Sequence, residues 1–246
     1  MKTLIKSMPV VGPMAKRLKR VISPPEQQSF VRSPAKDDFS KIENILNYTK
    51  TSGSSYAAKQ YPAGYHTITL GDRRLRGQRD PEMRFSVVPY DFTGKVVLDI
   101  GTNQGGMLHH LRDSISAGIG IDYDSRMVNA ATRIEATMGN GNLRFYTFDL
   151  QNDPLDLLQD LLPAKPDIIF LLAVCMWIRN WREVIDLSSE LAPAMLFESN
   201  GSPEQQAEQI AYLHQKYDHV LHLTDASHDD PGQKARELFL CKRAAT

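Results

Sequence analysis

A chain of 246 residues with 41% hydrophobic and 24% charged residues has a globular composition, which excludes disordered, collagen-like and coiled-coil classes. Its two cysteines, Cys175 and Cys241, exclude a disulfide framework and a cysteine-rich zinc site, and they favour a reducing, cytoplasmic compartment. The formal net charge is zero, but residues 1–36 carry eight Lys or Arg and one acid, so this segment is near +7 and the remainder near −7. We expect no metal site.

Residues 1–36 are predicted to form a basic arm that contains five prolines. Prolines at this density prevent a long helix, although residues 14–22 could form a short helix with cations on one side. A basic arm on an acidic body suggests an anionic partner, such as the inner face of a membrane, a phosphate or RNA. A solvated tail and packing against the protein's own body fit equally well. No apolar run approaches the roughly 20 residues that span a bilayer.

Residues 37–84 are predicted to form a helical and irregular cap segment. Residues 38–50 place four apolar side chains at helical spacing, and a loop rich in Gly and Ser follows at residues 51–55. The stretch 61–84 is unusual because it carries five arginines, among them Arg79 and Arg84.

From residue 95 onward, short apolar strands alternate with helices. Strands are predicted at residues 96–100, 119–122, 143–148, 167–174, 194–198, 219–223 and 237–242, and helices at 105–116, 125–138, 181–190 and 203–217. This alternation predicts an α/β fold with a Rossmann-like, doubly wound, mostly parallel seven-stranded sheet over residues 85–246. The last two strands are joined only by a polar loop, which favours an antiparallel last strand at the edge of the sheet.

The turn after the first predicted strand is rich in glycine. It begins after Asp99 and contains Gly101, Gly105 and Gly106, while Asn103 stands where a third glycine often occurs. Glycine lets the backbone approach a ligand closely, and Asn is among the few side chains that tolerate the left-handed region. In an open parallel sheet, ligands bind beyond the carboxyl ends of the strands, which is where this turn lies.

Three acids, Asp99, Asp122 and Asp149, end three successive predicted strands. Asp122 follows Gly101 by 21 residues, and a carboxylate there can accept hydrogen bonds from both hydroxyls of an adenosine ribose. Residues 101–106 read GTNQGG, which matches neither the G-x-G-x-x-G nicotinamide pattern nor a Walker A loop. A ligand with adenosine but without phosphates therefore fits best.

The run VLDIGTNQG at residues 97–105 resembles motif I of the class I, seven-stranded S-adenosylmethionine-dependent methyltransferases. Residues 120–125, GIDYDS, are similar to the second motif of that family, and residues 167–172, DIIFLL, to its fourth strand. The resemblance implies that S-adenosylmethionine is the cofactor. The residues implied to bind it are Asp99, Gly101, Asn103 and Gly105 around the methionine part, Asp122 at the ribose, Tyr123, Asp149 and Leu150 around the adenine, and Leu172 in the pocket wall.

Arg79 lies just before the predicted domain, on the side from which relatives of this family often close over the cofactor. We expect its guanidinium either to hold the carboxylate of the cofactor or an anionic substrate, or to form a salt bridge with the acidic body.

Methyl transfer mainly requires that the acceptor be aligned with the methyl group and that water be excluded, and a general base is needed only for a poorly ionised acceptor. Residues 175–180, CMWIRN, lack the histidine that many relatives carry there, and an N/D-P-P-Y/F signature is missing, which disfavours methylation of adenine or cytosine. The remaining candidates are Glu198 as a base or sugar ligand, Arg179 as a ligand of phosphate or carboxylate, and His228 as a base. Each also fits a cap, a salt bridge or a solvated loop.

The end of the fifth strand and the C-terminal residues are similar to methyltransferases of polysaccharide assembly. This resemblance implies a small-molecule or glycan acceptor, methylated on oxygen, such as a lipid-linked or phosphorylated sugar. The arginines alternatively suggest tRNA modification, which the pI of about 7.1 disfavours without excluding it. A non-catalytic regulator that keeps the fold is a third reading. The oligomeric state is left open.

Overall fold

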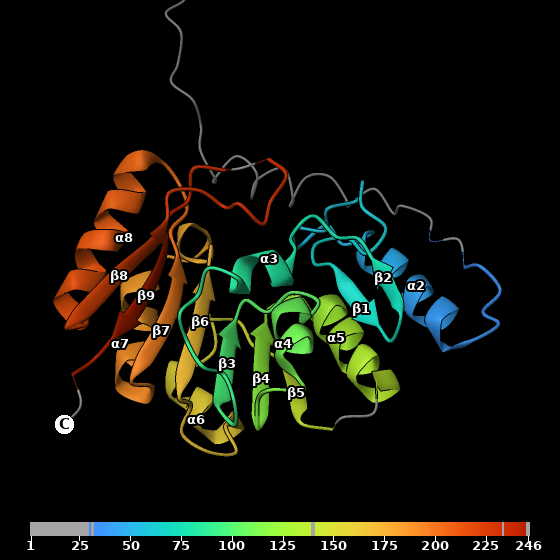
Figure 1. Ribbon diagram of the computed structural model, residues 1–246, viewed down its shortest axis with the longest axis horizontal. Helices are drawn as coiled ribbons and strands as arrows, with labels where there is room; N and C mark the ends of the chain where they lie inside the picture. Colours follow the sequence, from blue (N-terminus) through green and yellow to red (C-terminus); the bar gives the residue numbers. More distant parts are fainter. Residues whose placement is uncertain (1–29, 31, 139–140, 233, 245–246) are drawn as a thin grey trace, which may run out of the picture.

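The computed structural model describes residues 30, 32–138, 141–232 and 234–244 (Figure 1). The predicted helix at residues 14–22 lies outside these ranges. Within them, no helix is both long and apolar enough to cross a bilayer. The elements are α2 (Asp38–Thr49), β1 (Ile68–Leu70), β2 (Arg73–Leu75), α3 (Pro81–Phe85), β3 (Val96–Ile100), α4 (Gly106–Leu111), β4 (Ala117–Asp122), α5 (Ser125–Met138), β5 (Leu143–Thr147), η1 (Leu155–Leu157), α6 (Leu158–Leu161), β6 (Ile168–Leu172), η2 (Cys175–Trp177), α7 (Trp181–Leu191), β7 (Ala194–Glu198), α8 (Pro203–Lys216), β8 (His219–Thr224) and β9 (Leu238–Lys242).

Seven strands form one sheet in the order β5-β4-β3-β6-β7-β9-β8. The first five of these pair in parallel, whereas β9 is antiparallel to both of its neighbours. The predicted seven-stranded, Rossmann-like sheet with an antiparallel last strand is therefore confirmed. Because β9 inserts between β7 and β8, the edge strand is β8.

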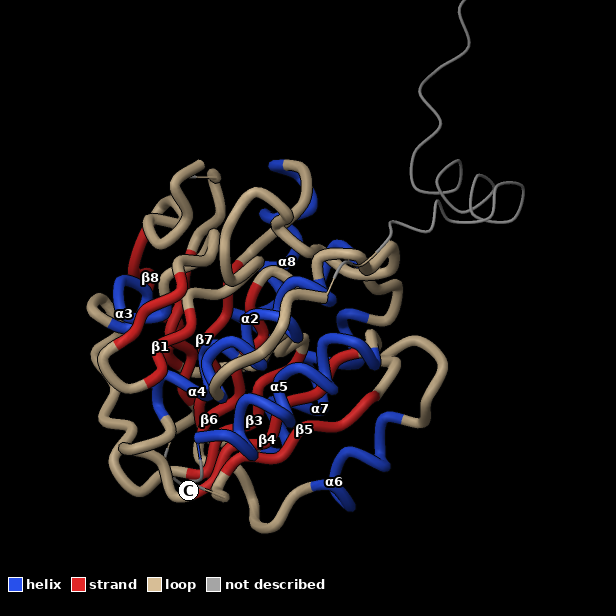
Figure 2. Tube along the Cα trace, turned by 90° about the vertical axis from the view of Figure 1, so that its right-hand side faces the viewer, coloured by secondary structure: helices blue, strands red, loops and turns tan. Residues whose placement is uncertain are grey.

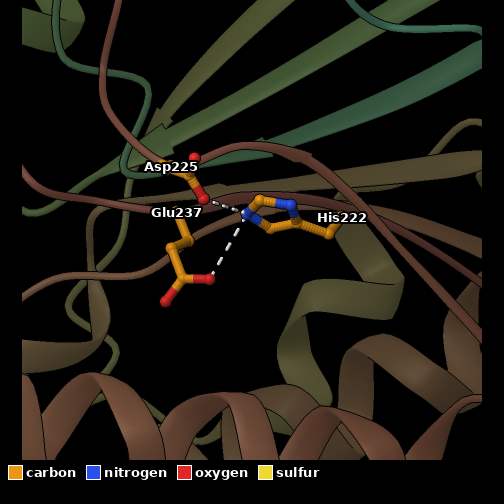
Figure 3. A group of neighbouring side chains, drawn as sticks. All are labelled: His222, Asp225 and Glu237. Atoms are coloured by element: carbon orange, nitrogen blue, oxygen red, sulfur yellow. Dashed lines mark ion pairs between the residues drawn. The ribbon is translucent and has the colours of Figure 1, made fainter.

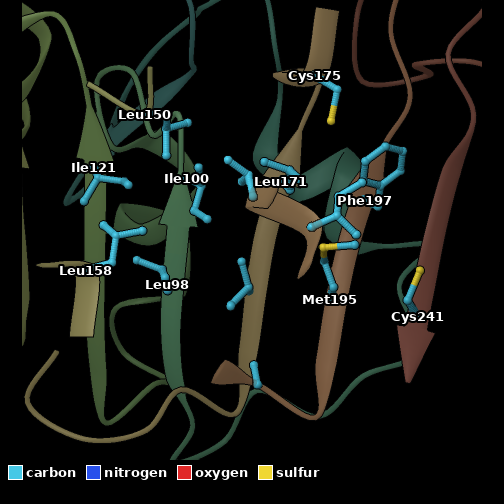
Figure 4. Packing of buried hydrophobic residues seen from close by; sticks show 14 of the residues in the cluster. Leu98, Ile100, Ile121, Leu150, Leu158, Leu171, Cys175, Met195, Phe197 and Cys241 are labelled. Carbon is cyan, nitrogen blue, oxygen red and sulfur yellow. The ribbon is translucent and has the colours of Figure 1, made fainter. Parts of the chain in front are cut away.

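The central strands β3, β4, β6 and β7 are buried on both faces, as expected for parallel strands between helices, whereas the edge strand β8 is partly exposed. Leu98 and Ile100 of β3 point to the face that α6, α7 and α8 cover, and Figure 4 shows the packing of this cluster. Val97 points to the opposite face, where α4 and α5 pack. This alternation leaves the carboxyl ends of the strands as the accessible edge for a site.

The cap segment packs over that edge and beside α5 (Figures 1 and 2). Its helix α2 begins at a capping box formed by Asp37 and Ser40, and it buries Ile42 and Leu46 against Ile134 of α5. The sequence did not predict the β1–β2 hairpin, whose strands have only three residues each, nor the short helix α3. Helix α4 is also shorter than the predicted 105–116, because a turn after Leu111 leads back to β4.

Candidate active site

The glycine-rich turn after β3 has three residues in the left-handed region: Gly101 (φ 79°), Asn103 (φ 51°) and Gly105 (φ 74°). The expectation that Asn103 adopts this conformation is confirmed. Space adds to the requirement for glycine, since a Cβ on Gly101 would lie 2.6 Å from Cγ2 of Val174. Any side chain at Gly101 would therefore both strain the backbone and collide with the loop after β6.

Asp122 ends β4 directly beside this turn. One carboxylate oxygen accepts from the backbone N–H of Asn103 at 3.0 Å, and the other accepts from that of Asp124 at 2.9 Å. The side chain is buried, and burial raises its pKa to about 6. These two backbone donors hold the carboxylate in a fixed orientation at the turn.

Asp99 lies one strand away and is equally buried. Its carboxylate accepts from the hydroxyl of Thr102 at 2.7 Å, and burial raises its pKa to about 7, with a smaller contribution from the nearby charge of Asp122. Neither acid forms an ion pair with a Lys or Arg in the part of the chain that the structure describes. Two buried carboxylates without a cation suit a ligand that brings hydroxyls and positive charge to this turn.

A family model of the methyltransferase domain matches residues 73–228 of the sequence. The chain belongs to this methyltransferase family.

Solved structures show the same fold at low sequence identity. The N-terminal domain of EvdMO1, crystallised in the presence of SAH and D-fucose, superposes with a TM-score of 0.58 at 11% identity, covering 85% of this chain and 98% of that one. WbdD in complex with a kinase inhibitor gives a TM-score of 0.55 at 15% identity, covering 68% of this chain and 42% of that one. The chain spans 40% of the longer EvdMO1 chain. No curated protein matches the sequence significantly.

The protein is thus an S-adenosylmethionine-dependent methyltransferase, and its turn fits that cofactor. The left-handed residues set the shape of the turn, Asp122 offers oriented oxygens for ribose hydroxyls, and Asp99 offers a carboxylate near the methionine part. The chemistry that the cofactor supplies when bound is an electrophilic methyl group on a sulfonium. The cofactor-binding role of each of these residues is inferred from its position and stays a prediction.

Two residues predicted to contact the adenine, Tyr123 and Asp149, have different surroundings. Tyr123 directly follows Asp122, and 49% of its surface is exposed at the carboxyl edge of the methyltransferase. Asp149 instead caps its own turn, since its carboxylate accepts from the backbone N–H of Gln151 at 2.9 Å and the amide of Asn152 at 2.6 Å.

Leu150 and Leu172, the apolar residues predicted for the pocket, are buried and half-buried. The carbonyl of Leu150 accepts from Nδ2 of Asn180 at 2.6 Å, which joins the loop after β5 to the loop after β6. A polar cavity of about 250 Å³ adjoins this contact, and its lining residues are Gln151, Asn152, Arg179, Asn180 and Glu183. The exposed Arg179 therefore lies beside the predicted adenine end of the site.

Glu198, at the end of β7, lies in a buried ion cluster, which we define as Arg79, Arg84, Glu198, Asp229 and Asp230. Nη2 of Arg79 donates to both oxygens of Glu198, at 2.7 and 2.8 Å, and Nη2 of Arg84 donates to one of them at 3.0 Å. Ser227 also donates to this carboxylate. Only 1% of Glu198 is exposed, so the structure does not present it as an accessible base or sugar ligand.

The loop between β8 and β9 supplies the remaining carboxylates of the buried ion cluster. Asp229 accepts from Nε of Arg79 at 2.9 Å and from Nη2 of Arg84 at 3.0 Å, and Asp230 lies 3.5 Å from Nη1 of Arg79. Of the two alternatives for Arg79, the structure shows the salt bridge, and the buried guanidinium does not reach the glycine-rich turn. Burial raises the pKa values of Glu198 and Asp229, while Arg79 lowers them.

His228, the third catalytic candidate, holds the same loop to the cap. Its ring Nε2–H donates to the carbonyl of Met83 in α3 at 2.8 Å. The backbone N–H of Asp80 reinforces this contact by donating to the carbonyl of Asp229 at 3.1 Å. The geometry of His228 accordingly supports a structural contact, and its role as a base stays a prediction.

Gln104, inside the motif, is a functional residue that sequence reasoning missed. It is fully buried, its carbonyl accepts from the backbone N–H of Tyr65 at 3.1 Å, and its amide donates to Thr49 at 2.6 Å. A buried amide in the glycine-rich turn therefore fastens the cap of the methyltransferase to the cofactor site. The sequence contained no local pattern that pairs position 104 with the cap.

A further set of residues, which we name the aromatic–cationic rim, consists of Tyr56, Tyr65, Lys234 and Arg236. The carbonyl of Tyr56 accepts from Nδ2 of Asn103 at 3.1 Å, and its ring meets that of Tyr65 edge to face at 5.4 Å. Nζ of Lys234 lies 5.3 Å from the centroid of the Tyr56 ring. Burial and the nearby guanidinium of Arg236 lower the pKa of Lys234. The rim thus places Lys234 beside an aromatic ring next to the cofactor turn, with the charge of Arg236 close by.

Proposed function

We propose that this methyltransferase methylates an oxygen of a sugar-containing acceptor that carries a phosphate or carboxylate group. The observation that carries the proposal is the chain of contacts from Asn103 in the cofactor turn, through Tyr56, to Lys234. An acceptor that bridges these residues would have its anionic group at the rim and its reacting oxygen near the cofactor.

The chemistry of the rim suits such an acceptor. A tyrosine offers an apolar ring with a polar tip, and 49% of the surface of Tyr56 is exposed. Lys234 and Arg236 repel one another, and an anionic group between them relieves this repulsion while forming charge-assisted hydrogen bonds. The presence of D-fucose with the N-terminal domain of EvdMO1 supports a sugar acceptor by likeness of fold.

In this proposal the residues of the chain act mainly by positioning. Asp122 and Asp99 orient the cofactor from one side, the rim holds the acceptor from the other, and the cap excludes water between them. We assign no general base, because Glu198 is engaged by two guanidinium groups and His228 by a carbonyl.

The test is transfer of labelled methyl from S-adenosylmethionine to sugar phosphates, uronic acids, neutral sugars and unmodified tRNA. With an anionic sugar, Lys234→Ala should raise KM about 10-fold, the loss of one charge-assisted contact, and leave kcat and cofactor affinity nearly unchanged. Lys242→Ala is the matched control. This exposed lysine ends β9 beside the first residue of β7, at the end of the sheet away from the cofactor turn. Preferential methylation of tRNA, or equal use of neutral sugars, would contradict the proposal.

The structure gives the alternative of tRNA modification less support than the sequence did. Of the five arginines, Arg79 and Arg84 are buried in the ion cluster. Arg74 pairs with Asp80 at 2.5 Å and with Glu82 at 3.1 Å. These three guanidinium groups are therefore engaged by carboxylates of the chain itself and do not form a phosphate-binding surface.

We also propose that the enzyme works in the cytoplasm, with its basic arm on an anionic membrane. Cys175 and Cys241 are buried and free, which suits a reducing compartment, and the cluster Lys16, Arg17, Lys19 and Arg20 would supply attraction to anionic lipid. Sedimentation with phosphatidylserine vesicles should be lost when these four cations are replaced by Ala. Equal sedimentation of the wild type with neutral vesicles would contradict the idea.

A further inference from the structure

Three side chains that could bind a metal meet at the base of the loop between β8 and β9 (Figure 3). His222 lies in β8, Asp225 follows that strand, and Glu237 directly precedes β9. Nε2 of His222 is 3.3 Å from an oxygen of Asp225 and 3.3 Å from an oxygen of Glu237. All three donor atoms lie within 4.8 Å of one another. The expectation from the sequence was that there is no metal site; His222 and Asp225 are three residues apart, but Glu237 comes only 12 residues after Asp225.

The two distances match those between ligands of one metal ion. Ligands bound at about 2.0–2.1 Å with tetrahedral angles are separated by about 3.3–3.4 Å. The contacts of His222 are longer than a charge-assisted hydrogen bond, for which about 2.7–2.9 Å is typical. The spacing is thus better suited to an ion held between the groups than to direct hydrogen bonds.

The charge of the cluster also calls for a cation. Within residues 30–244, apart from the few that the structure does not describe, neither Asp225 nor Glu237 pairs with a Lys or Arg, and each has only the imidazole of His222 as its ion-pair partner. With that imidazole neutral, two carboxylates stand close together without compensation. A divalent ion would remove their mutual repulsion.

Packing holds the side chain of His222, and hydrogen bonds hold the backbone of Glu237. The ring of His222 packs against that of Phe239 at 5.1 Å, across the register pair that joins β8 and β9. Glu237 is fixed by Ser199, whose hydroxyl accepts its backbone N–H at 2.9 Å and whose backbone N–H donates to its carbonyl at 2.9 Å. The imidazole, and the backbone from which the Glu237 carboxylate extends, therefore lose little freedom on binding a metal.

We propose that His222, Asp225 and Glu237 bind a divalent transition-metal ion of the zinc type, with the remaining coordination position open to water. An imidazole among the ligands favours such an ion over Mg²⁺ or Ca²⁺, which prefer oxygen ligands only. The ion would join the two ends of the loop that carries Asp229 and Asp230 of the buried ion cluster. Its role is therefore to close the base of this loop and to stabilise it against opening.

The first experiment is calorimetric titration of the full chain with Zn²⁺, together with the visible absorption spectrum of added Co²⁺. We expect one ion per chain and a tetrahedral cobalt spectrum. Both His222→Ala and Glu237→Gln should weaken binding by at least about 10-fold, since loss of a ligand costs no less than loss of a supporting contact. His219→Ala, which removes an exposed histidine from the same strand, is the matched control and should bind as the wild type does.

The second readout is trypsin cleavage after Lys234 and Arg236 in the loop. Zn²⁺ should slow cleavage at these sites in the wild type and in His219→Ala, but not in His222→Ala. Absence of a stoichiometric site, unchanged affinity in both ligand variants, or equal protection by Mg²⁺ would overturn the proposal. None of these outcomes depends on the acceptor, so a failure of the metal-site proposal can be distinguished from a failure of the proposed function.

Discussion

Glu198→Gln changes one atom at the centre of the buried ion cluster and separates a structural role of this residue from a catalytic one. Both carboxylate oxygens accept from guanidinium N–H groups, of Arg79 at 2.7 and 2.8 Å and of Arg84 at 3.0 Å. A glutamine amide must turn an N–H₂ group toward one of these donors, so a buried guanidinium N–H loses its charged acceptor even though Asp229 and Asp230 still pair with the two arginines. Removing one partner of a buried pair costs about 3–5 kcal/mol, a large share of the total stability of a typical domain.

Urea denaturation followed by the fluorescence of Trp177 and Trp181 measures this effect. In a thermal melt of a protein of this size, the same loss of about 3–5 kcal/mol would lower the Tm by about 6–20 °C. Glu208→Gln is the control, because Glu208 forms an exposed pair with Arg182 at 3.1 Å and should contribute less than about 1 kcal/mol. If Glu198→Gln were as stable as the wild type but had lost methyl transfer, Glu198 would be a catalytic base and our interpretation of the cluster would be wrong.

Three further changes test the cofactor site and the cap. Asp122→Asn should weaken binding of S-adenosylhomocysteine about 10- to 100-fold in calorimetry. Because burial raises the pKa of Asp122 to about 6, the affinity of the wild type should decrease below pH 6, whereas the affinity of the variant should not change with pH in this range. Burial lowers the pKa of His109 to about 3, so between pH 6.5 and 3 only the unfolded state binds a proton at this residue. As the pH falls through this range, the wild type should therefore lose up to about 1.4 kcal/mol of stability per pH unit more than His109→Leu does. Urea titrations at several pH values measure this difference. Gly106→Ala places a Cβ 2.1 Å from that of His66 and should cost about 1–3 kcal/mol in urea denaturation, whereas unchanged stability would show that the cap packs loosely there.

The fold could be predicted from the sequence wherever a local period determines the structure. The bounds predicted for residues 96–100, 125–138 and 194–198 agree with β3, α5 and β7, because each element is buried along a regular apolar pattern. The β1–β2 hairpin was missed because three-residue strands carry no such period. Its arginines resembled a phosphate-binding surface only while their carboxylate partners were unknown.

In the candidate site, too, only the features that depend on residues close together in the sequence could be predicted. The conformations of the cofactor turn depend on neighbouring residues, so Gly101, Asn103 and the acid that ends β4 could be recognised from their spacing. The buried ion cluster depends instead on residues that are 119 positions apart for Arg79 and Glu198 and 145 apart for Arg84 and Asp229. No local pattern relates such positions, and a charged residue in a sequence looks the same whether it is solvated or paired.

The contacts of the cap explain why the cofactor turn and the acceptor side should behave as one unit. Gln104 and Asn103 of the turn hold the cap through Tyr65, Thr49 and Tyr56, while the buried ion cluster holds the end of the same cap to β7 and the loop before β9. A displacement of the turn therefore moves the backbone that carries the aromatic side of the rim, and opening of the loop removes Lys234 from it. Because a packed interior transmits such shifts and does not absorb them, cofactor binding at the turn and acceptor binding at the rim are expected to be energetically coupled.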